Sequence, residues 1–366
     1  MTKNSCVLSL LTSALTVVTT MQLATAAEVR PPLSMGEKTE VVKALAAQLK
    51  AKYVFPDVAE RVAKALAEKA AKGEYASAGT EQAFAEQLTK DLQDLGKDKH
   101  FRVRFTPGFK PEPDDDTAAT PQQMAEAREE ATKQAYGIAR VERLPGNVGY
   151  LDLRSFEQTE FVAQAYSSAM SLLSGTDALI LDLRRNGGGE PASVAYLLSH
   201  FFAQGDYRHL NDIYNRPKNT TREYWTVPSV GVRYARPVYI LTSNYTFSGG
   251  EECAYDFQTQ KRAILVGETT RGGANPGDMV PISHDFNAFV PTGRAINPIT
   301  HTNWEHVGVK PDVPVPASQA EQWAYADILR KIVIPNEKEA RKVDALTALL
   351  AKVEKGENVT QFVPSH

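Results

Sequence analysis

The 366-residue sequence predicts an α/β fold in which a layered core of strands and helices follows a small helical N-terminal domain. The first observation is that short apolar runs, such as residues 178–183 and 237–242, alternate with longer segments of helical spacing. Runs of this kind are typical of strands that are buried on both faces of a parallel sheet. The second observation is that, between residues 33 and 96, apolar residues recur at helical spacing in three segments. In such a fold, a functional site is expected at the carboxyl ends of the strands.

The first 26 residues are predicted to be a signal peptide. Lys3 supplies positive charge, residues 7–23 are mostly apolar, and small residues precede Ala27. Polar residues interrupt the apolar run, which makes it a poor membrane span. We therefore expect cleavage after Ala26, export to the periplasm or beyond, and no integral membrane span in the mature chain.

The remaining elements follow in order. Residues 27–106 are predicted to form the helical N-terminal domain, and residues 107–146 a linker or flap that is rich in Pro, Asp and Glu before a helix at 121–139. The α/β core is expected at 147–317 and further helices at 318–366. Within the core we predict strands at 148–153, 178–183, 237–242 and 263–266, and helices at 160–173, 192–202 and 250–259.

Composition and charge exclude some classes of function. The chain has 42% hydrophobic and 23% charged residues, as ordinary globular proteins do. Its net charge is -3, so the chain lacks the positive electrostatic field that nucleic-acid binding requires. Cys253 is the one cysteine of the predicted mature chain, which excludes an intrachain disulfide and favours a buried core residue.

Ser248 lies where a predicted strand ends and a helix begins, directly before Gly249 and Gly250. This position favours a hydroxyl at a sharp turn, with backbone amides directed at developing negative charge. The alternative is that Ser248 is a simple helix cap. A second glycine cluster follows strand 178–183, so an amide of Gly188 or Gly189 is a candidate oxyanion donor opposite Gly249. This cluster lacks the pattern of a P-loop or a dinucleotide-binding loop.

A serine nucleophile needs a base to remove its proton. His100 follows the helical domain and precedes the strand-like residues 101–105. His301 and His306 remain rivals on the same physical grounds.

These segments resemble the C-terminal processing (tail-specific) serine peptidase family, in the branch of the tricorn core protease and interphotoreceptor retinoid-binding protein. The matching segments are 98–100, 179–189, 242–251, 266–273 and 303–312. The resemblance implies a layered, crotonase/Clp-protease-like ββα core. Because residues 107–146 are too few for a PDZ module, none is expected.

The resemblance also assigns a base. The tail-specific branch uses a lysine at the position of Gly273, so a lysine mechanism is not expected here. The tricorn-like branch implies His100 as the base and Glu305 as the carboxylate that orients it, directly or through an intermediary. Glu268 is a reserve candidate, although a structural role is favoured for it, as it is for Arg184.

We therefore expect an exported serine peptidase that acts on a protein or peptide through a Ser248 acyl-enzyme, without a metal or cofactor. An alternative is a carrier of a retinoid-like or fatty ligand, with Tyr245, Phe286, Phe289 and Trp304 as candidate pocket residues. An esterase or amidase is a third option because the same chemistry serves any acyl group. The oligomeric state is not predicted.

Overall fold

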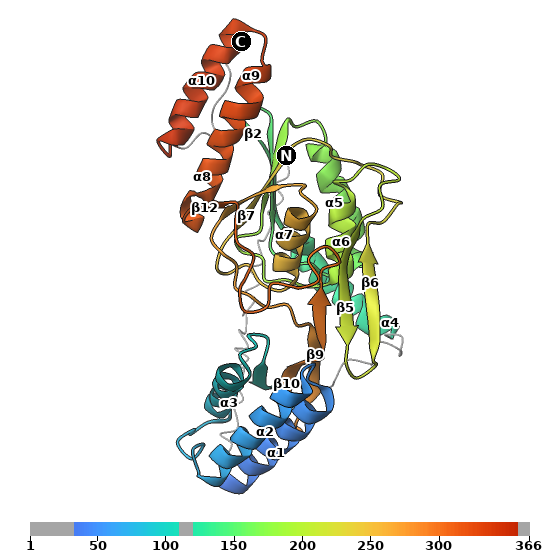
Figure 1. Cartoon of the computed structure of the whole chain (residues 1–366), viewed down its shortest axis with the longest axis vertical. Helices are drawn as coiled ribbons and strands as arrows, with labels where there is room; N and C mark the ends of the chain where they lie inside the picture. Colours follow the sequence, from blue (N-terminus) through green and yellow to red (C-terminus); the bar gives the residue numbers. More distant parts are fainter. Residues whose placement is uncertain (1–32, 110–119, 358–366) are drawn as a thin grey trace, which may run out of the picture. The chain divides into compact units, whose positions relative to one another are not determined.

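The computed structural model describes residues 33–109 and 120–357. The predicted signal peptide and the most acidic part of the predicted linker, residues 110–119, lie outside the described residues. The elements shown in Figure 1 are α1 (Met35–Lys52), α2 (Pro56–Ala71), α3 (Glu81–Gly96), β1 (Arg102–Phe105), α4 (Pro121–Lys133), η1 (Ala135–Gly137), β2 (Ile138–Leu144), β3 (Val148–Leu153), α5 (Thr159–Leu173), β4 (Ala178–Asp182), α6 (Pro191–Ser199), β5 (His209–Asn215), β6 (Thr220–Trp225), β7 (Val238–Thr242), α7 (Gly249–Thr259), β8 (Ile264–Gly267), β9 (Gly277–Pro281), β10 (Phe286–Pro291), β11 (Gly293–Ile296), β12 (Val313–Pro314), α8 (Ala317–Ile328), η2 (Leu329–Val333), α9 (Ile334–Asn336) and α10 (Ala340–Glu354).

The central feature is a six-stranded sheet with the order β12-β8-β7-β4-β3-β2. The strands from β12 to β3 run parallel, and β2 is antiparallel to β3. Every residue of β3, β4 and β7 is buried, because helices cover both faces. Leu179 and Leu181 pack with residues of α5, α6 and α7, whereas Ala178 and Ile180 pack with α8 and α10. This arrangement confirms the predicted α/β layers.

Helices α1, α2 and α3 form the predicted N-terminal helical region. Ser34 and Glu37 cap α1 reciprocally, Pro56 is the first residue of α2, and Thr80 caps α3. The helices pack on the three-stranded sheet β1-β10-β9, and Phe286 of β10 lies in their core. Residues 277–291 therefore complete the N-terminal unit, although they come from the predicted core segment.

The described part of the predicted linker is ordered structure. Helix α4 lies within the range predicted for a helix, and β2 adds an edge strand to the main sheet. The core sheet thus begins at Ile138, earlier than the expected residue 147. A third sheet, β11-β5-β6, was not predicted. The lack of a PDZ module stays a prediction.

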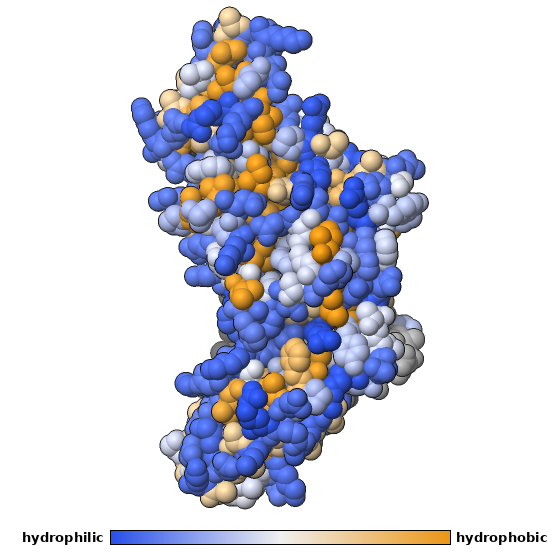
Figure 2. Space-filling model, in the orientation of Figure 1, coloured by the Kyte–Doolittle hydropathy of each residue, from blue (hydrophilic) through white to orange (hydrophobic). Residues whose placement is uncertain are grey.

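Figure 2 shows one face of the molecule, on which hydrophilic residues predominate and hydrophobic residues lie in small groups. Among residues 33–109 and 120–357, no helix combines the length and apolar character that crossing a bilayer requires.

Candidate active site

Ser248 occupies a strained turn between β7 and α7. Its φ of 53° and ψ of -122° lie in a region that residues with side chains rarely adopt. Such strain persists only where the surrounding structure enforces it, commonly at functional sites. Ser248 is the N-cap residue of α7, and its amide donates to the Glu251 carboxylate at 3.0 Å, as in a capping box. The strain at Ser248 exceeds what a helix cap requires, because N-cap residues usually lie in the extended region.

The carboxylate of Glu251 fixes the backbone of the serine turn through hydrogen bonds. Its buried carboxylate accepts hydrogen bonds from the backbone amides of Ser248 at 3.0 Å, Gly272 at 2.6 Å and Gly273 at 2.9 Å, and from the Thr270 hydroxyl at 2.5 Å. Burial raises the pKa of Glu251 to about 7, although these hydrogen bonds act in the opposite direction. The sequence analysis gave Glu251 no role. The Ser-x-x-Glu spacing of a capping box was the signal that could have identified it.

The loop after β4 contacts the serine turn. The amide of Phe247 donates to the carbonyl oxygen of Asn186 at 3.1 Å. The side chain of Asn186, which is fully buried, donates to the carbonyl oxygen of Leu153 at 3.0 Å and accepts from the amide of Gly188 at 2.8 Å. Asn186 therefore fixes the shape of the glycine loop. Its side-chain oxygen accepts from the Gly188 amide, so this predicted oxyanion donor already has a partner.

The other two predicted donors are available. Among the hydrogen bonds between described residues, none uses the backbone amide of Gly189 or of Gly249. The two loops meet without side chains: a Cβ atom on Gly188 would lie 2.7 Å from Cβ of Ser248, and one on Gly249 would lie 2.8 Å from the carbonyl oxygen of Gly189. Glycine is required at both positions because of this close approach.

His100 comes from the N-terminal unit and lies against the serine turn. Its ring centroid is 4.4 Å from that of Phe247, the residue before Ser248, and 6.0 Å from that of Phe289 on β10. A Cβ atom on Gly273 would lie 2.8 Å from Cε1 of His100 and 2.3 Å from Cε2 of Phe247. The backbone of Gly273 is thus covered by these two rings, and no side chain fits at the position where the related branch has lysine.

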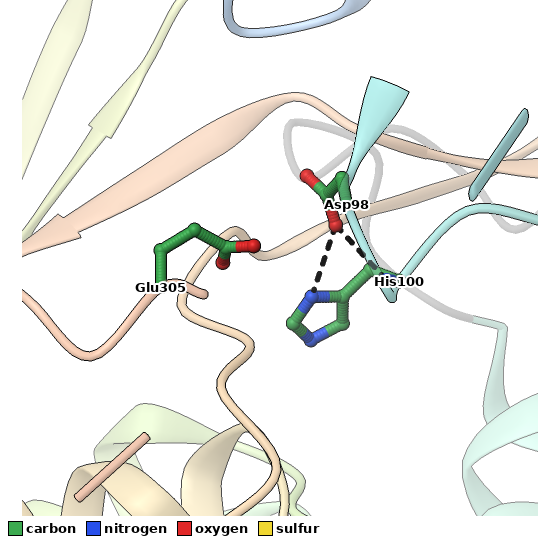
Figure 3. A group of neighbouring side chains, drawn as sticks. All are labelled: Asp98, His100 and Glu305. Carbon is green, nitrogen blue, oxygen red and sulfur yellow. Dashed lines mark hydrogen bonds and ion pairs between the residues drawn. The ribbon is translucent and has the colours of Figure 1, made fainter. Parts of the chain in front are cut away.

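Asp98 is the carboxylate next to the imidazole (Figure 3). One of its oxygens accepts from the His100 amide at 2.9 Å and lies 3.5 Å from Nδ1 of the same residue. The other oxygen accepts from Nδ2 of Asn275 at 2.8 Å and from the hydroxyl of Tyr53 at 3.3 Å. Neither ring nitrogen of His100 has a hydrogen-bond partner within the described part of the chain. The side chain of Asp98 therefore faces Nδ1 and leaves Nε2 directed elsewhere.

Glu305 lies on the other side of this group (Figure 3). Oε2 of Glu305 accepts from the amide of Ala274 at 2.5 Å, and Oε1 lies 3.4 Å from Nδ1 of His306. Burial, followed by the charge of Asp98, raises the pKa of Glu305 to about 8. One atom each from Asp98, His100 and Glu305 lie within 4.8 Å of one another, close enough to hold a metal ion. The sequence analysis had assigned only the last two, although Asp98 is two residues before His100.

The remaining candidates lie apart from the serine turn or are exposed. Glu268 accepts from the amides of Asn244 at 3.2 Å and Ala317 at 3.1 Å, which supports the structural role favoured for it. His301 is exposed. The side chain of His306 is 57% exposed and has Glu305 as its partner.

The aromatic residues that were proposed to line a ligand pocket lie in different parts of the structure. Trp304 and Phe286 are buried in two different cores. Tyr245 and Phe289 line a cavity of about 300 Å³ together with Lys99, His100, Arg102, Arg104, Gly187, Phe247, Arg271 and Met279. Cys253 is fully buried, as predicted.

Comparisons with known proteins identify the family and the fold. Residues 147–315 match Peptidase family S41, and residues 34–138 match the N-terminal domain of Peptidase_S41 in eukaryotic IRBP. The chain is 29% identical over 194 residues to carboxyl-terminal-processing peptidase 2, chloroplastic, of Arabidopsis thaliana, which covers 49% of this chain and 35% of the relative. It is 25% identical over 226 residues to a carboxyl-terminal-processing protease of Synechocystis sp., which covers 61% of this chain and 49% of the relative.

The chain thus spans at most about half the length of these two relatives. Among solved structures, mature CPAF shares the fold with a TM-score of 0.56 at 11% identity, over 88% of this chain and 99% of that one.

Proposed function

We propose that this chain, which belongs to peptidase family S41, is a serine peptidase that hydrolyses peptide bonds through an acyl-enzyme on Ser248. The observation that carries the proposal is the strained turn at Ser248, which the glycine loop approaches closely and whose Phe247 packs on the ring of His100. The amides of Gly189 and Gly249 at this junction make no hydrogen bond with another described residue. A nucleophile, a base and oxyanion donors are the three components that acyl transfer needs.

In the proposed reaction, Oγ of Ser248 attacks the carbonyl carbon of the scissile bond while Nε2 of His100 takes the hydroxyl proton. The amides of Gly249 and Gly189 stabilise the oxyanion of the tetrahedral intermediate. His100 then gives the proton to the leaving amine, and the acyl group remains on Ser248. Water, deprotonated by His100, releases the acyl group as a carboxylic acid and restores the hydroxyl.

We infer that Asp98 is the positioning residue for His100 and that Glu305 acts through Asp98. Asp98 faces Nδ1 of the imidazole, so a negative charge there stabilises the imidazolium formed during the reaction. Burial and the nearby Asp98 raise the pKa of Glu305, which favours its protonated form and limits repulsion between the two carboxyl groups.

The test uses an unstructured protein substrate and a fluorophosphonate, which labels activated serines. Ser248→Ala is expected to abolish both hydrolysis and labelling while thermal unfolding stays as in the parent protein. Ser229→Ala, on an exposed serine away from the site, is the matched control and is expected to keep both. Hydrolysis that persists in Ser248→Ala contradicts the proposal.

Two further measurements separate rival functions. A metallohydrolase that used Asp98, His100 and Glu305 would lose activity in a chelator, whereas the serine mechanism predicts full activity there. A lipid carrier would bind a retinoid or fatty acid saturably and resist labelling. The cationic side chains that line the cavity disfavour an uncharged retinoid, whereas a fatty acid could place its carboxylate there, so the labelling result decides between carrier and peptidase.

Export is also part of the proposal. The composition of residues 1–26 supports it, and sequencing of the N-terminus of the mature protein is expected to begin at Ala27. A mature protein that retained Met1 would contradict this prediction.

A further inference from the structure

The cavity beside the proposed active site carries an unusual charge. Four of the described residues that line it, Lys99, Arg102, Arg104 and Arg271, are cationic, and none of the described lining residues is Asp or Glu. The cavity also includes His100 and Phe247, and it therefore adjoins the residues that flank Ser248. A substrate bound at Ser248 would extend past this group of cations.

Arg102 and Arg104 of β1 supply two of these charges. They alternate along β1 with buried Val103, so both project from the same face of the strand. In the sheet register Arg102 is opposite Phe289, and Phe289 is opposite Met279, which places a row of cavity residues on one face. Neither guanidinium forms a hydrogen bond or ion pair with another described residue.

Lys99 and Arg271 are held at the other side of the cavity. Nζ of Lys99 donates to the carbonyl oxygen of Arg271, and the guanidinium of Arg271 lies over the ring of Phe247, 5.0 Å from its centroid. Neither contact is an ion pair with a carboxylate.

The two neighbouring acids do not line the cavity. Asp98 is fully buried, and its oxygens accept from Asn275, Tyr53 and His100. Oε2 of Glu305 accepts from the backbone amide of Ala274 at 2.5 Å, so this carboxyl group is held at the backbone. Uncompensated arginines that share a partly enclosed, aromatic-lined space favour an anionic ligand, since the guanidinium fork matches the two oxygens of a carboxylate.

We propose that this cavity is a subsite for an acidic side chain, Asp or Glu, of the peptide substrate close to the bond that is cleaved. The inference rests on the proposed function, because it takes the bound peptide to reach Ser248. It goes further by naming a substrate class: peptides whose cleavage site is flanked by carboxylates. The methylene groups of a glutamate would lie against Phe289 and Phe247 while its carboxylate meets Arg102 and Arg104.

The first experiment measures binding without catalysis. Ser248→Ala is titrated with two fluorescent peptides that are amidated at the carboxyl terminus and differ only in three consecutive glutamates or glutamines. A hydrogen bond to a charged group predicts that the glutamate peptide binds at least about tenfold more tightly. This difference is expected to shrink to less than about threefold in 0.5 M salt, because salt screens exposed charges.

Variants connect that preference to the cavity. In the Ser248→Ala background, Arg102→Gln and Arg104→Gln are each expected to remove most of the preference for glutamate. Arg143→Gln, on an exposed arginine of β2, makes the same charge change outside the cavity and is expected to leave the preference intact. An equal loss in all three variants would assign the effect to net charge and overturn the proposal.

The remaining outcomes separate this inference from the proposed function. Equal binding of the glutamate and glutamine peptides overturns the subsite, even if the parent enzyme hydrolyses both. Failure of the parent enzyme to hydrolyse either peptide or an unstructured protein counts against the peptidase, while the binding comparison still decides the subsite. A third peptide has glutamines and a free carboxyl terminus. If it binds as tightly as the amidated glutamate peptide, the cavity takes a terminal carboxylate and the proposal is wrong.

Discussion

Replacement of Asp98 by asparagine tests the proposed orientation of the base most directly. Both oxygens of Asp98 accept hydrogen bonds, one from the His100 amide and the other from Asn275 and Tyr53. Asp98→Asn turns one oxygen into a donor. Oδ1 of Asn275 is buried without a partner, so a flip of the Asn275 amide can accept from the new donor. The geometry thus survives, and the main loss is the negative charge beside Nδ1 of His100.

The magnitudes follow from these contacts. Loss of hydrogen bonds to a charged group predicts a fall of about 1–3 kcal/mol in the free energy of unfolding. The effect on catalysis is larger: loss of an oriented general base predicts a fall of about 100-fold or more in kcat/KM. Glu305→Gln is expected to lower kcat/KM less, because Glu305 is proposed to act through Asp98 and its raised pKa already favours the uncharged form.

The assay is hydrolysis of a fluorogenic peptide, with urea unfolding of each variant measured in parallel. Asp344→Asn, on an exposed aspartate of α10, is the control and is expected to match the parent enzyme in both measurements. If Asp98→Asn folds normally and keeps kcat/KM within about threefold of the parent value, Asp98 does not orient His100. If Glu305→Gln alone is inactive, Glu305 orients the base directly.

Three other predictions concern the same site. Gly273→Ala would place Cβ 2.3 Å from Phe247 and 2.8 Å from His100, so we expect fluorophosphonate labelling to slow at least about tenfold and stability to fall by about 1–3 kcal/mol; a normal labelling rate would show that the rings move aside. The raised pKa of Glu305, from 4.5 to about 8, means that the folded chain binds this proton more tightly than the unfolded chain. Stability should therefore fall as pH rises from about 4.5 to 8, and Glu305→Gln should flatten this slope in urea unfolding at pH 5, 6.5 and 8; an unchanged slope would contradict the assigned shift. Asn186→Ala removes both side-chain bonds that shape the glycine loop, so kcat should fall by more than KM changes; an effect on KM alone would argue against a role in holding the oxyanion donors.

Sequence patterns predicted the main sheet well because the signal for each of its central strands lies within the strand's own residues. The strands β3, β4 and β7 lie within one residue of their predicted ranges at each end, since continuous apolar runs specify strands buried on both faces. The serine turn was predicted from the junction of such a strand with a helix. The close approach of the second loop requires glycine at positions 188 and 249, and both glycines are visible in the sequence.

The parts that were missed depend on residues far apart in the chain. No local pattern tells that β1 pairs with β10, because strand pairing depends on register and burial across the whole fold. The predicted N-terminal domain therefore lacked the later strands that pair with β1. Asp98 was missed for a similar reason: its partners Tyr53 and Asn275 identify it as a buried carboxylate, and neither lies near it in the sequence.

The pairing of β1 with β10 also bears on the order in which the proposed site can assemble during synthesis. The ribosome makes His100 early and Ser248 much later, but the strand that anchors β1 follows later still, at residues 286–291. A nascent chain that already contains His100 and Ser248 therefore still lacks the strand on which β1 pairs. If the two residues act together as proposed, activity appears only after most of the polypeptide has been made.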